Sequence, residues 1–183
     1  RHPFTISSSP KENKLHFTVK LTGRFTKALS ELKKGEKIIV DGPFGIFTIE
    51  DYDKDLVFIA GGVGITPFMS IIKDKIENNK PQNIVLLYGS KTKEDIIFKN
   101  ELDSIKEEWF KKVYILSNDH SFVKTGEYEA GYVNQEIIKK YVKNIDNSLF
   151  YICGPELMKN SVRKSLKELS IKNKDIMIED FFW

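Results

Sequence analysis

A chain of 183 residues fits one large domain, or one domain with part of a second. Its 29 lysines and arginines and 26 acidic residues are interspersed, which argues against a nucleic-acid-binding protein. The single cysteine, Cys153, excludes an internal disulfide and an all-cysteine metal or iron–sulfur site, and no apolar run approaches the roughly 18–20 residues that span a bilayer. These features predict a cytoplasmic protein with no nucleic-acid partner and no resident metal.

The first fifty residues predict short strands. The chain begins at Arg1 in mid-pattern, without an initiating methionine, so we expect it to be a fragment. Apolar and polar residues alternate over Leu15–Leu21, which is typical of a half-buried strand, and Lys37–Asp41 predicts another. Between them, Thr26–Leu32 predicts one or two helical turns. The charged segment Asp51–Asp55 predicts a linker.

Beyond the linker, strands and helices alternate. Helices are expected from about Pro67 to Asn78, from about Glu94 to Trp109, around Val133–Val142 and after Pro155, and Thr92 with Asp95 resembles a capping box for the second. The predicted strands are Leu56–Ala60, Ile84–Tyr88, Val113–Leu116, Leu149–Cys153 and Asp175–Ile178. This order predicts an α/β fold with a doubly wound, parallel, five-stranded sheet and helices on both faces.

The most informative segment follows the first of these strands. The apolar run Leu56–Ala60 ends in Gly61, Gly62 and Gly64, and Thr66-Pro67 then opens a helix. Glycines let the backbone approach a ligand, and free N–H groups at a helix start favour a phosphate. A glycine-rich turn without a ligand is the alternative, because this spacing is a weak pattern by itself.

Three such turns follow strands of the predicted sheet. Small residues and a helix start recur in Gly61–Thr66, in Gly89-Ser90-Lys91-Thr92 and in Cys153-Gly154-Pro155-Glu156. Ligands of doubly wound sheets bind beyond the carboxyl ends of the strands, near the switch in strand order. The three turns together therefore predict a nucleotide site at this edge.

Six segments, in this order along the chain, carry a resemblance to a known superfamily. They are His2-Pro3-Phe4-Thr5-Ile6-Ser7-Ser8, Gly23-Arg24-Phe25-Thr26, Asp41-Gly42-Pro43-Phe44-Gly45, Gly61–Pro67, Tyr151-Ile152-Cys153-Gly154-Pro155 and Glu179-Asp180-Phe181-Phe182-Trp183. The chain resembles ferredoxin–NADP reductase-like flavoproteins, and its His-Pro-Phe-Thr form resembles their ferric reductase and NADPH oxidase branch. The resemblance implies hydride transfer from NAD(P)H to FAD, followed by release of single electrons to an acceptor.

For FAD, the resemblance implies a set of binding residues, most of them within the first 26 positions. Phe4 matches the aromatic residue that stacks on the flavin ring, and Thr5 matches the hydroxyl residue that hydrogen-bonds the reactive flavin nitrogen. The family usually has arginine two positions before that aromatic, where this chain has His2 with Arg1 beside it, so either could contact the pyrophosphate. The further implied FAD residues are Pro3, Lys20, Phe25, Thr26 and the terminal Phe181.

For NAD(P)H, the resemblance adds roles at the ends of strands. Cys153 matches the cysteine beside the nicotinamide, Glu179 the terminal acid, and Phe181 the aromatic that covers the flavin, with Trp183 and Phe182 as alternatives. Together with Thr5, these give the predicted catalytic set. The expected NAD(P)H-binding residues are Gly61, Gly62, Gly64, Thr66, Pro67, Gly89, Ser90, Lys91, Cys153, Gly154 and Pro155.

Two departures from the family pattern matter. Residues 1–52 offer about three strands of an antiparallel FAD-binding β-barrel that uses about six, so we expect missing strands upstream, a possible membrane haem domain before them, and weak FAD binding by this chain. Residues 53–183 form the predicted NAD(P)H domain. After its third strand, Ser117-Asn118-Asp119 carries no cation for a 2′-phosphate, although Lys91 and Lys124 lie nearby in sequence, so NADH is favoured over NADPH.

Three functions remain open at this point. The leading one is a flavin-dependent NAD(P)H oxidoreductase module that passes electrons to a haem, ferric iron or a redox protein, at the cytoplasmic face of a membrane if a membrane domain precedes it. A second is the electron-transfer component of an oxygenase or dehydrogenase, and a third is a non-catalytic nucleotide-binding module. Phe4 as barrel core, Thr5 as a plain strand residue, His2 as a surface residue and Cys153 as packing are the non-functional alternatives.

Overall fold

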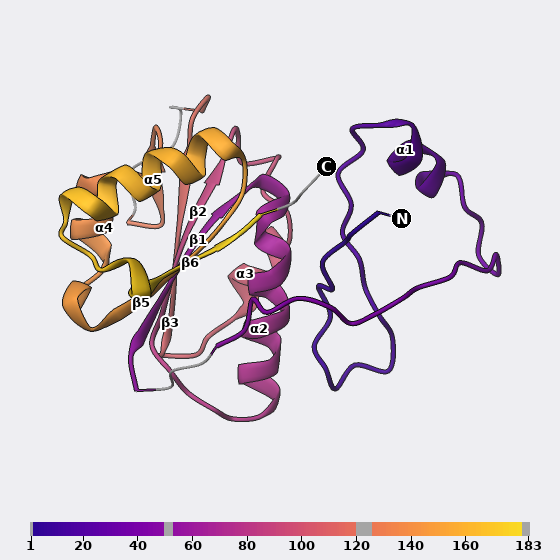
Figure 1. The fold of residues 1–183 in the computed structure, drawn as a ribbon, viewed down its shortest axis with the longest axis horizontal. Coiled ribbons are helices and arrows are strands. Elements are labelled where there is room, and N and C mark those ends of the chain that lie inside the picture. The colour runs from indigo at the N-terminus through magenta and orange to yellow at the C-terminus, as the bar shows by residue number, and fades with distance from the viewer. Residues whose placement is uncertain (1, 50–52, 120–125, 181–183) are drawn as a thin grey trace.

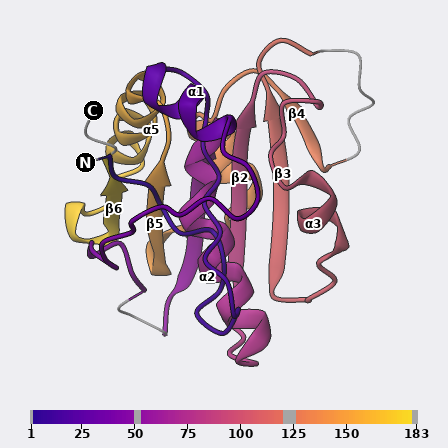
Figure 2. The same cartoon turned by 90° about the vertical axis from the view of Figure 1, so that its right-hand side faces the viewer.

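The computed structural model describes residues 2–49, 53–119 and 126–180. Residues 53–180 form three layers, a parallel sheet between two pairs of helices (Figures 1 and 2). The sheet order is β4-β3-β2-β1-β5-β6, and every neighbouring pair is parallel. The strands are β1 (Asp55–Gly61), β2 (Ile84–Ser90), β3 (Phe110–Leu116), β4 (Tyr128–Ala130), β5 (Ser148–Cys153) and β6 (Ile176–Glu179).

Helices cover both faces of this sheet, as the sequence predicts. On one face α2 (Thr66–Glu77) and α3 (Lys99–Ser104) enclose a core that includes Phe58, Phe68 and Leu102. On the other face α4 (Gln135–Tyr141) and α5 (Glu156–Glu168) enclose a second core. Strands β1 and β5 are buried on both sides because each side meets a helix layer. The doubly wound parallel fold is therefore confirmed.

The sheet differs from the prediction at one edge, where a sixth described strand is added. Tyr128–Ala130 lies outside every strand predicted from sequence, but it pairs with β3 as β4. Only three residues long, it shows too little alternation to be recognised from sequence. Its Glu129 is buried beneath α4, where it accepts a hydrogen bond from the Tyr141 hydroxyl.

The predicted helix from Glu94 to Trp109 is wrong over most of its length. Only α3, Lys99–Ser104, is helical, because Phe98 adopts a left-handed conformation with φ of 61° and interrupts the chain before it. Thr92 donates a hydrogen bond to Asp95 at 3.1 Å, as a capping box would, yet no helix begins there. Trp109 instead leads into β3, and its carbonyl accepts the Ile84 N–H at 2.7 Å.

The strands expected within the first 49 residues are also absent from the described part of the chain. Leu15–Leu21 and Lys37–Asp41 form no strand, and one isolated antiparallel bridge joins Ile6 to Phe17. The expected helical turns are present as α1 (Arg24–Ser30). A strand needs a neighbour to satisfy its backbone groups, and residues 2–49 supply too few neighbours to close a barrel.

Several polar contacts attach this N-terminal segment to the α2 side of the sheet (Figure 1). The hydroxyl of Ser70 on α2 donates to the Ser8 carbonyl at 2.8 Å, and the Ser9 hydroxyl bonds Glu77 at the end of α2. Farther along, the Tyr151 hydroxyl donates to the Thr48 carbonyl at 3.0 Å. The three serines at positions 7 to 9 are buried, so this is a packed junction.

Candidate functional site

The predicted nucleotide edge lies where the strand order reverses. The chain runs outward from β1 through β2 and β3 to β4, then returns to place β5 on the other side of β1. The switch point is therefore between β1 and β5, and the Gly61–Thr66 turn and the Cys153–Pro155 turn leave the sheet at that point. Gly89, at the end of β2, is in register with Gly61. The structure thus brings the three predicted turns to one edge.

Three glycines let the turns after β1 and β5 interlock. A Cβ on Gly64 would lie 2.2 Å from the carbonyl oxygen of Cys153. A Cβ on Gly61 would lie 2.6 Å from the sulfur of Met158, and one on Gly154 would lie 3.1 Å from the Cα of Gly61. Protein contacts therefore require glycine at these positions, whereas the sequence interpretation assigned them to ligand approach. We call Gly61, Gly64 and Gly154 the interlocked glycines.

Gly62 has a different environment. It adopts φ of 53°, in the left-handed region that favours glycine, and no heavy atom lies within 4 Å of where its Cβ would be. A 3₁₀ turn over Gly62–Ile65 begins here and runs directly into α2, with Pro67 in the first turn of that helix. The first N–H groups of such a helical start have no acceptor within the helix. Open space beside N–H groups of this kind can accept an anionic group such as a nucleotide phosphate.

The hydroxyl of Tyr88 supports this turn through a hydrogen bond. Its ring is fully buried in β2, and its hydroxyl donates to the Gly62 carbonyl at 2.9 Å and accepts from the Ile97 N–H at 3.2 Å. Burial raises the pKa of Tyr88, so the hydroxyl stays protonated and able to donate. Tyr88 was not among the residues predicted from sequence. A tyrosine directly after the aliphatic run Ile84–Leu87 was the available signal, because a buried tyrosine hydroxyl usually finds a partner.

The loop after β3 closes against the loop after β2. The N–H of Ser117 donates to the Ser90 carbonyl at 3.0 Å, and that of Asn118 donates to the Lys91 carbonyl at 2.9 Å. Lys91 is exposed, so its ammonium is the cation that these paired loops present. Lys124, the other predicted cation, lies outside the described residues.

Cys153 and Glu179 lie side by side at the ends of β5 and β6. They are register partners, and Cys153 is also the partner of Ala60 on β1. The thiol is fully buried, and burial, with the nearby Glu179 carboxylate, raises its pKa to about 12. Burial and the neighbouring Asp180 also raise the pKa of Glu179. The thiol is therefore protonated at neutral pH and cannot act as a thiolate nucleophile.

A buried lysine on α5 organises charge beside this pair. Lys159 bonds Glu156 at 2.8 Å and also pairs with Asp180, the residue after Glu179. Burial alone would lower its pKa, but its hydrogen bonds to Asp180 and Glu156 and their negative charge together outweigh burial, so the pKa of Lys159 is raised. Lys159 is thus charged and fixes the chain just beyond β6. The predicted Phe181 lies outside the described residues.

The predicted FAD residues gather at the free end of the N-terminal segment. The rings of His2 and Phe25 stack with centroids 3.8 Å apart, and Phe4 is stacked parallel to Phe25 at 6.2 Å. The Thr5 hydroxyl forms no hydrogen bond with any residue in the described ranges. Pro3 and Lys20 are exposed, and Arg1 lies outside the described residues. Phe4 and Thr5 precede the Ser8 contact with α2 by only a few residues.

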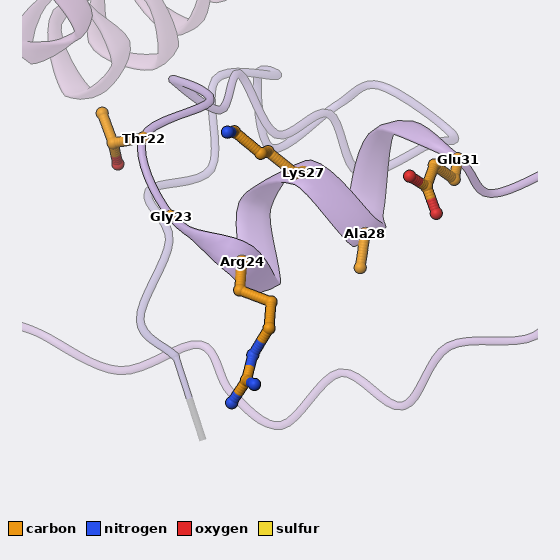
Figure 3. A pocket seen from close by; sticks show the side chains of 6 residues that line it. All are labelled: Thr22, Gly23, Arg24, Lys27, Ala28 and Glu31. Carbon is orange, nitrogen blue, oxygen red and sulfur yellow. The ribbon is translucent and has the colours of Figure 1, made fainter.

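Thr26 stabilises the start of α1 in the same segment. Its hydroxyl accepts the N–H groups of Thr22 and Gly23, each at 3.0 Å, and caps α1. Beside this cap is a cavity of about 450 Å³ that Arg24 and Lys27 line (Figure 3). These two cations were not predicted as site residues, although they flank the predicted Phe25 and Thr26 in the sequence.

Comparisons with known proteins agree with this geometry. The oxidoreductase NAD-binding domain family matches residues 58–164. A subunit of the Na(+)-translocating NADH-quinone reductase of Yersinia enterocolitica is 30% identical over 165 residues, which cover 87% of this chain and 40% of that protein. The chain thus spans about two fifths of the curated relatives that it matches. No helix in the described ranges is long and apolar enough to cross a membrane.

Solved structures share the fold over almost the whole chain. A ferredoxin–NADP+ reductase from Neisseria gonorrhoeae with bound FAD and NADP has a TM-score of 0.80 at 21% identity, over 98% of this chain and 79% of that one. The flavohem-like FAD/NAD-binding domain of nitric oxide dioxygenase from Vibrio cholerae has a TM-score of 0.80 at 20% identity, over 96% and 75%. With the family match over more than half of its length, this chain belongs to the oxidoreductase NAD-binding domain family, and its fold is that of ferredoxin–NADP reductase-like flavoproteins.

Proposed function

We propose that this chain binds NADH on the turn after β1 and delivers its hydride to FAD held by the N-terminal segment, from which single electrons pass to an acceptor. The observation that carries the proposal is the turn itself. It combines open space at Gly62 and the first N–H groups of the Gly62–Ile65 turn with rigid support from the interlocked glycines and Tyr88. These residues bind and orient a nucleotide without a large conformational change.

Two small, buried residues would then lie beneath the nicotinamide. Ala60 and Cys153 are the small side chains at the ends of the two strands that flank the switch point, on the α2 side of the sheet. The neutral, buried thiol adds no charge there, and together with the apolar core it keeps water from the reacting atoms. FAD supplies the conversion of a two-electron donor into single-electron transfers.

The N-terminal residues are proposed to hold FAD. Phe4 and Phe25 offer parallel ring faces, and Thr5 offers a hydroxyl without a partner in the described ranges. The cavity beside α1 offers two cations, Arg24 and Lys27, against one acid, Glu31, for a pyrophosphate. The Ser8 and Ser9 contacts with α2 hold this segment beside the helix whose start receives the nucleotide. We therefore place both cofactors at the junction of the N-terminal segment and α2.

Further strands are proposed to complete the FAD-binding unit. Apolar side chains of the segment after α1 lie open to solvent, with Ile39 fully exposed, Ile46 91% exposed and Phe44 82% exposed. Exposed apolar surface of this extent marks a missing partner. The structural neighbours share the fold of nearly the whole chain and have additional residues of their own, which supports strands outside positions 1–183 as that partner.

NADH is preferred to NADPH in this proposal. The loop after β3 offers Ser117 and Asn118, and its backbone is bonded to Ser90 and Lys91. Lys91 is the single exposed cation that these described loops present for a 2′-phosphate. The matched relatives are NADH-quinone reductase subunits by name, which supports the same preference.

Those relatives also favour a more specific role. Each is a subunit of an assembly, so the acceptor of this chain is proposed to be a redox protein or a haem domain of the same assembly. A location at the cytoplasmic face of a membrane follows if a membrane domain is part of that assembly.

The test uses the longer protein that contains this chain. We expect it to purify with bound flavin, and stopped-flow absorbance should show flavin bleaching on mixing with NADH and reoxidation by ferricyanide. NADPH should give a much smaller kcat/KM. Nucleotide binding without flavin binding would favour a non-catalytic module, and a strong NADPH preference would reverse the choice of nucleotide.

A further inference from the structure

Positive charge is concentrated on one side of the molecule. Residues 135–174 carry nine lysines and arginines but four acidic residues, whereas the whole chain has an excess of only three cations. This stretch contains α4 and α5, which cover the sheet face turned away from the N-terminal segment (Figure 1). Most of these cations therefore lie on the side of the sheet opposite the N-terminal segment, whereas Lys159 lies beside Cys153.

Four cations without an ion-pair partner in the described residues line a groove on this side. A cavity of about 870 Å³ is lined by Arg163, Lys164 and Lys167 from α5 and by Lys172 from the loop that follows. Its lining contains no carboxylate, and none of the four cations forms an ion pair with a residue of the described ranges. Like charges three and four residues apart on one helix repel each other. We call this cavity the basic groove.

The floor of the basic groove is apolar and ends at an edge of the sheet. Ile171, Ile176 and Ile178 line it and pack partly against the α5-side core. Ile176 and Ile178 belong to β6, which pairs with β5 and ends the sheet order within the described residues (Figure 2). An edge strand presents backbone N–H and C=O groups that can pair with another chain. Apolar and cationic side chains thus flank an available strand edge.

We propose that the basic groove binds an extended acidic segment of a partner protein, which adds as a strand to the edge of β6. Backbone pairing with β6 would supply affinity, and alternate side chains would meet the isoleucine floor and the cations. The concave shape with recessed isoleucines fits a polypeptide better than a flat lipid surface, which needs protruding apolar groups. Because the groove lies on the opposite sheet face from the N-terminal segment, the bound segment tethers a partner without covering the nucleotide turn.

The experiment measures binding of a defined probe. A fluorescein-labelled peptide of alternating glutamate and valine is titrated with the purified protein and followed by fluorescence anisotropy, beside the same peptide with glutamine in place of glutamate. The groove variant is Arg163→Gln with Lys167→Gln. The matched control is Lys139→Gln with Lys143→Gln, which removes the same charge from exposed positions on and just after α4, outside the groove.

The groove variant should bind the acidic peptide about tenfold more weakly, and the α4 control should stay within about twofold of the wild type. Hydrogen exchange of the Ile176–Glu179 amides should slow when the peptide binds, and NADH affinity should not change in either variant. Equal losses in both variants would refute the groove, and binding without β6 protection would refute strand addition. Sedimentation with phosphatidylserine vesicles that depends on Arg163 and Lys167, without peptide binding, would assign the groove to lipid and overturn the proposal.

Discussion

Replacing Tyr88 with phenylalanine removes one oxygen atom from beneath the nucleotide turn. That hydroxyl links the Gly62 carbonyl to the Ile97 N–H, at 2.9 and 3.2 Å, inside a fully buried site. Each hydrogen bond contributes about 0.5–1.5 kcal/mol net, so losing both should lower the free energy of unfolding by about 2 kcal/mol. For a domain of this size that corresponds to roughly 4–8 °C in Tm.

The same substitution should weaken nucleotide binding. Without the hydroxyl, the Gly62 carbonyl is free to rotate, and the N–H groups that follow it lose their fixed direction. We expect NADH to bind about tenfold more weakly, a difference of about 1.4 kcal/mol, measured by isothermal titration calorimetry. In the longer flavin-containing protein, KM should rise more than kcat falls, because the chemistry itself does not involve Tyr88.

Tyr114→Phe provides a matched control. Tyr114 is the register partner of Tyr88 on β3, is equally buried, and donates its hydroxyl to Asp103 at 2.8 Å, away from the turn. It should lose comparable stability in urea denaturation and keep wild-type NADH affinity. Unchanged affinity in Tyr88→Phe would refute the positioning role, and equal loss of affinity in both variants would show that general destabilisation is the cause.

Three further predictions concern the strand ends. Gly64→Ala should lower the free energy of unfolding by about 2–4 kcal/mol in urea denaturation, because its Cβ would meet the Cys153 backbone, whereas Gly23→Ala, with no atom within 4 Å, should be tolerated. Cys153 should resist iodoacetamide at neutral pH in the folded protein and react after unfolding, as mass spectrometry would show; rapid native labelling would contradict its burial and raised pKa. Because the folded state raises the pKa of Glu179, its contribution to stability is present below the ordinary carboxyl range and is lost as pH rises through the folded pKa. Glu179→Gln should therefore gain stability over the wild type at neutral pH and lose that advantage in acid, and a pH-independent difference would contradict the shift.

The strand framework could be predicted from sequence because burial on both faces leaves long apolar runs. Leu56–Ala60, Ile84–Tyr88 and Leu149–Cys153 all became central strands with errors of one or two residues at their ends. The same logic failed for Leu15–Leu21, whose alternation is that of a strand. Alternating apolar and polar residues indicate which face of a strand would be buried. A strand also needs a neighbouring strand to pair with, and residues 2–49 do not supply one.

The site could be predicted where glycines follow the ends of strands. It could not be predicted where a side chain forms a hydrogen bond or ion pair with a residue far away in the sequence. The three turns meet at one edge as expected, because parallel strands bring their carboxyl ends together. Tyr88 and Lys159 were missed because their partners, Gly62 and Asp180, lie more than twenty residues away in the chain. The break at Phe98 was missed because a left-handed residue other than glycine leaves no compositional trace.

The interlocked glycines also constrain how this protein can change over time. A side chain at Gly64 or Gly154 meets backbone of the opposite turn, so neither position can accept a substitution unless the other turn moves as well. At Gly61 the nearest neighbours are side chains, Met158 at 2.6 Å and Pro155 at 2.9 Å, so an alanine there would need both of them to shift. The two turns should therefore vary together, because a side chain added to one turn requires a matching change in the other.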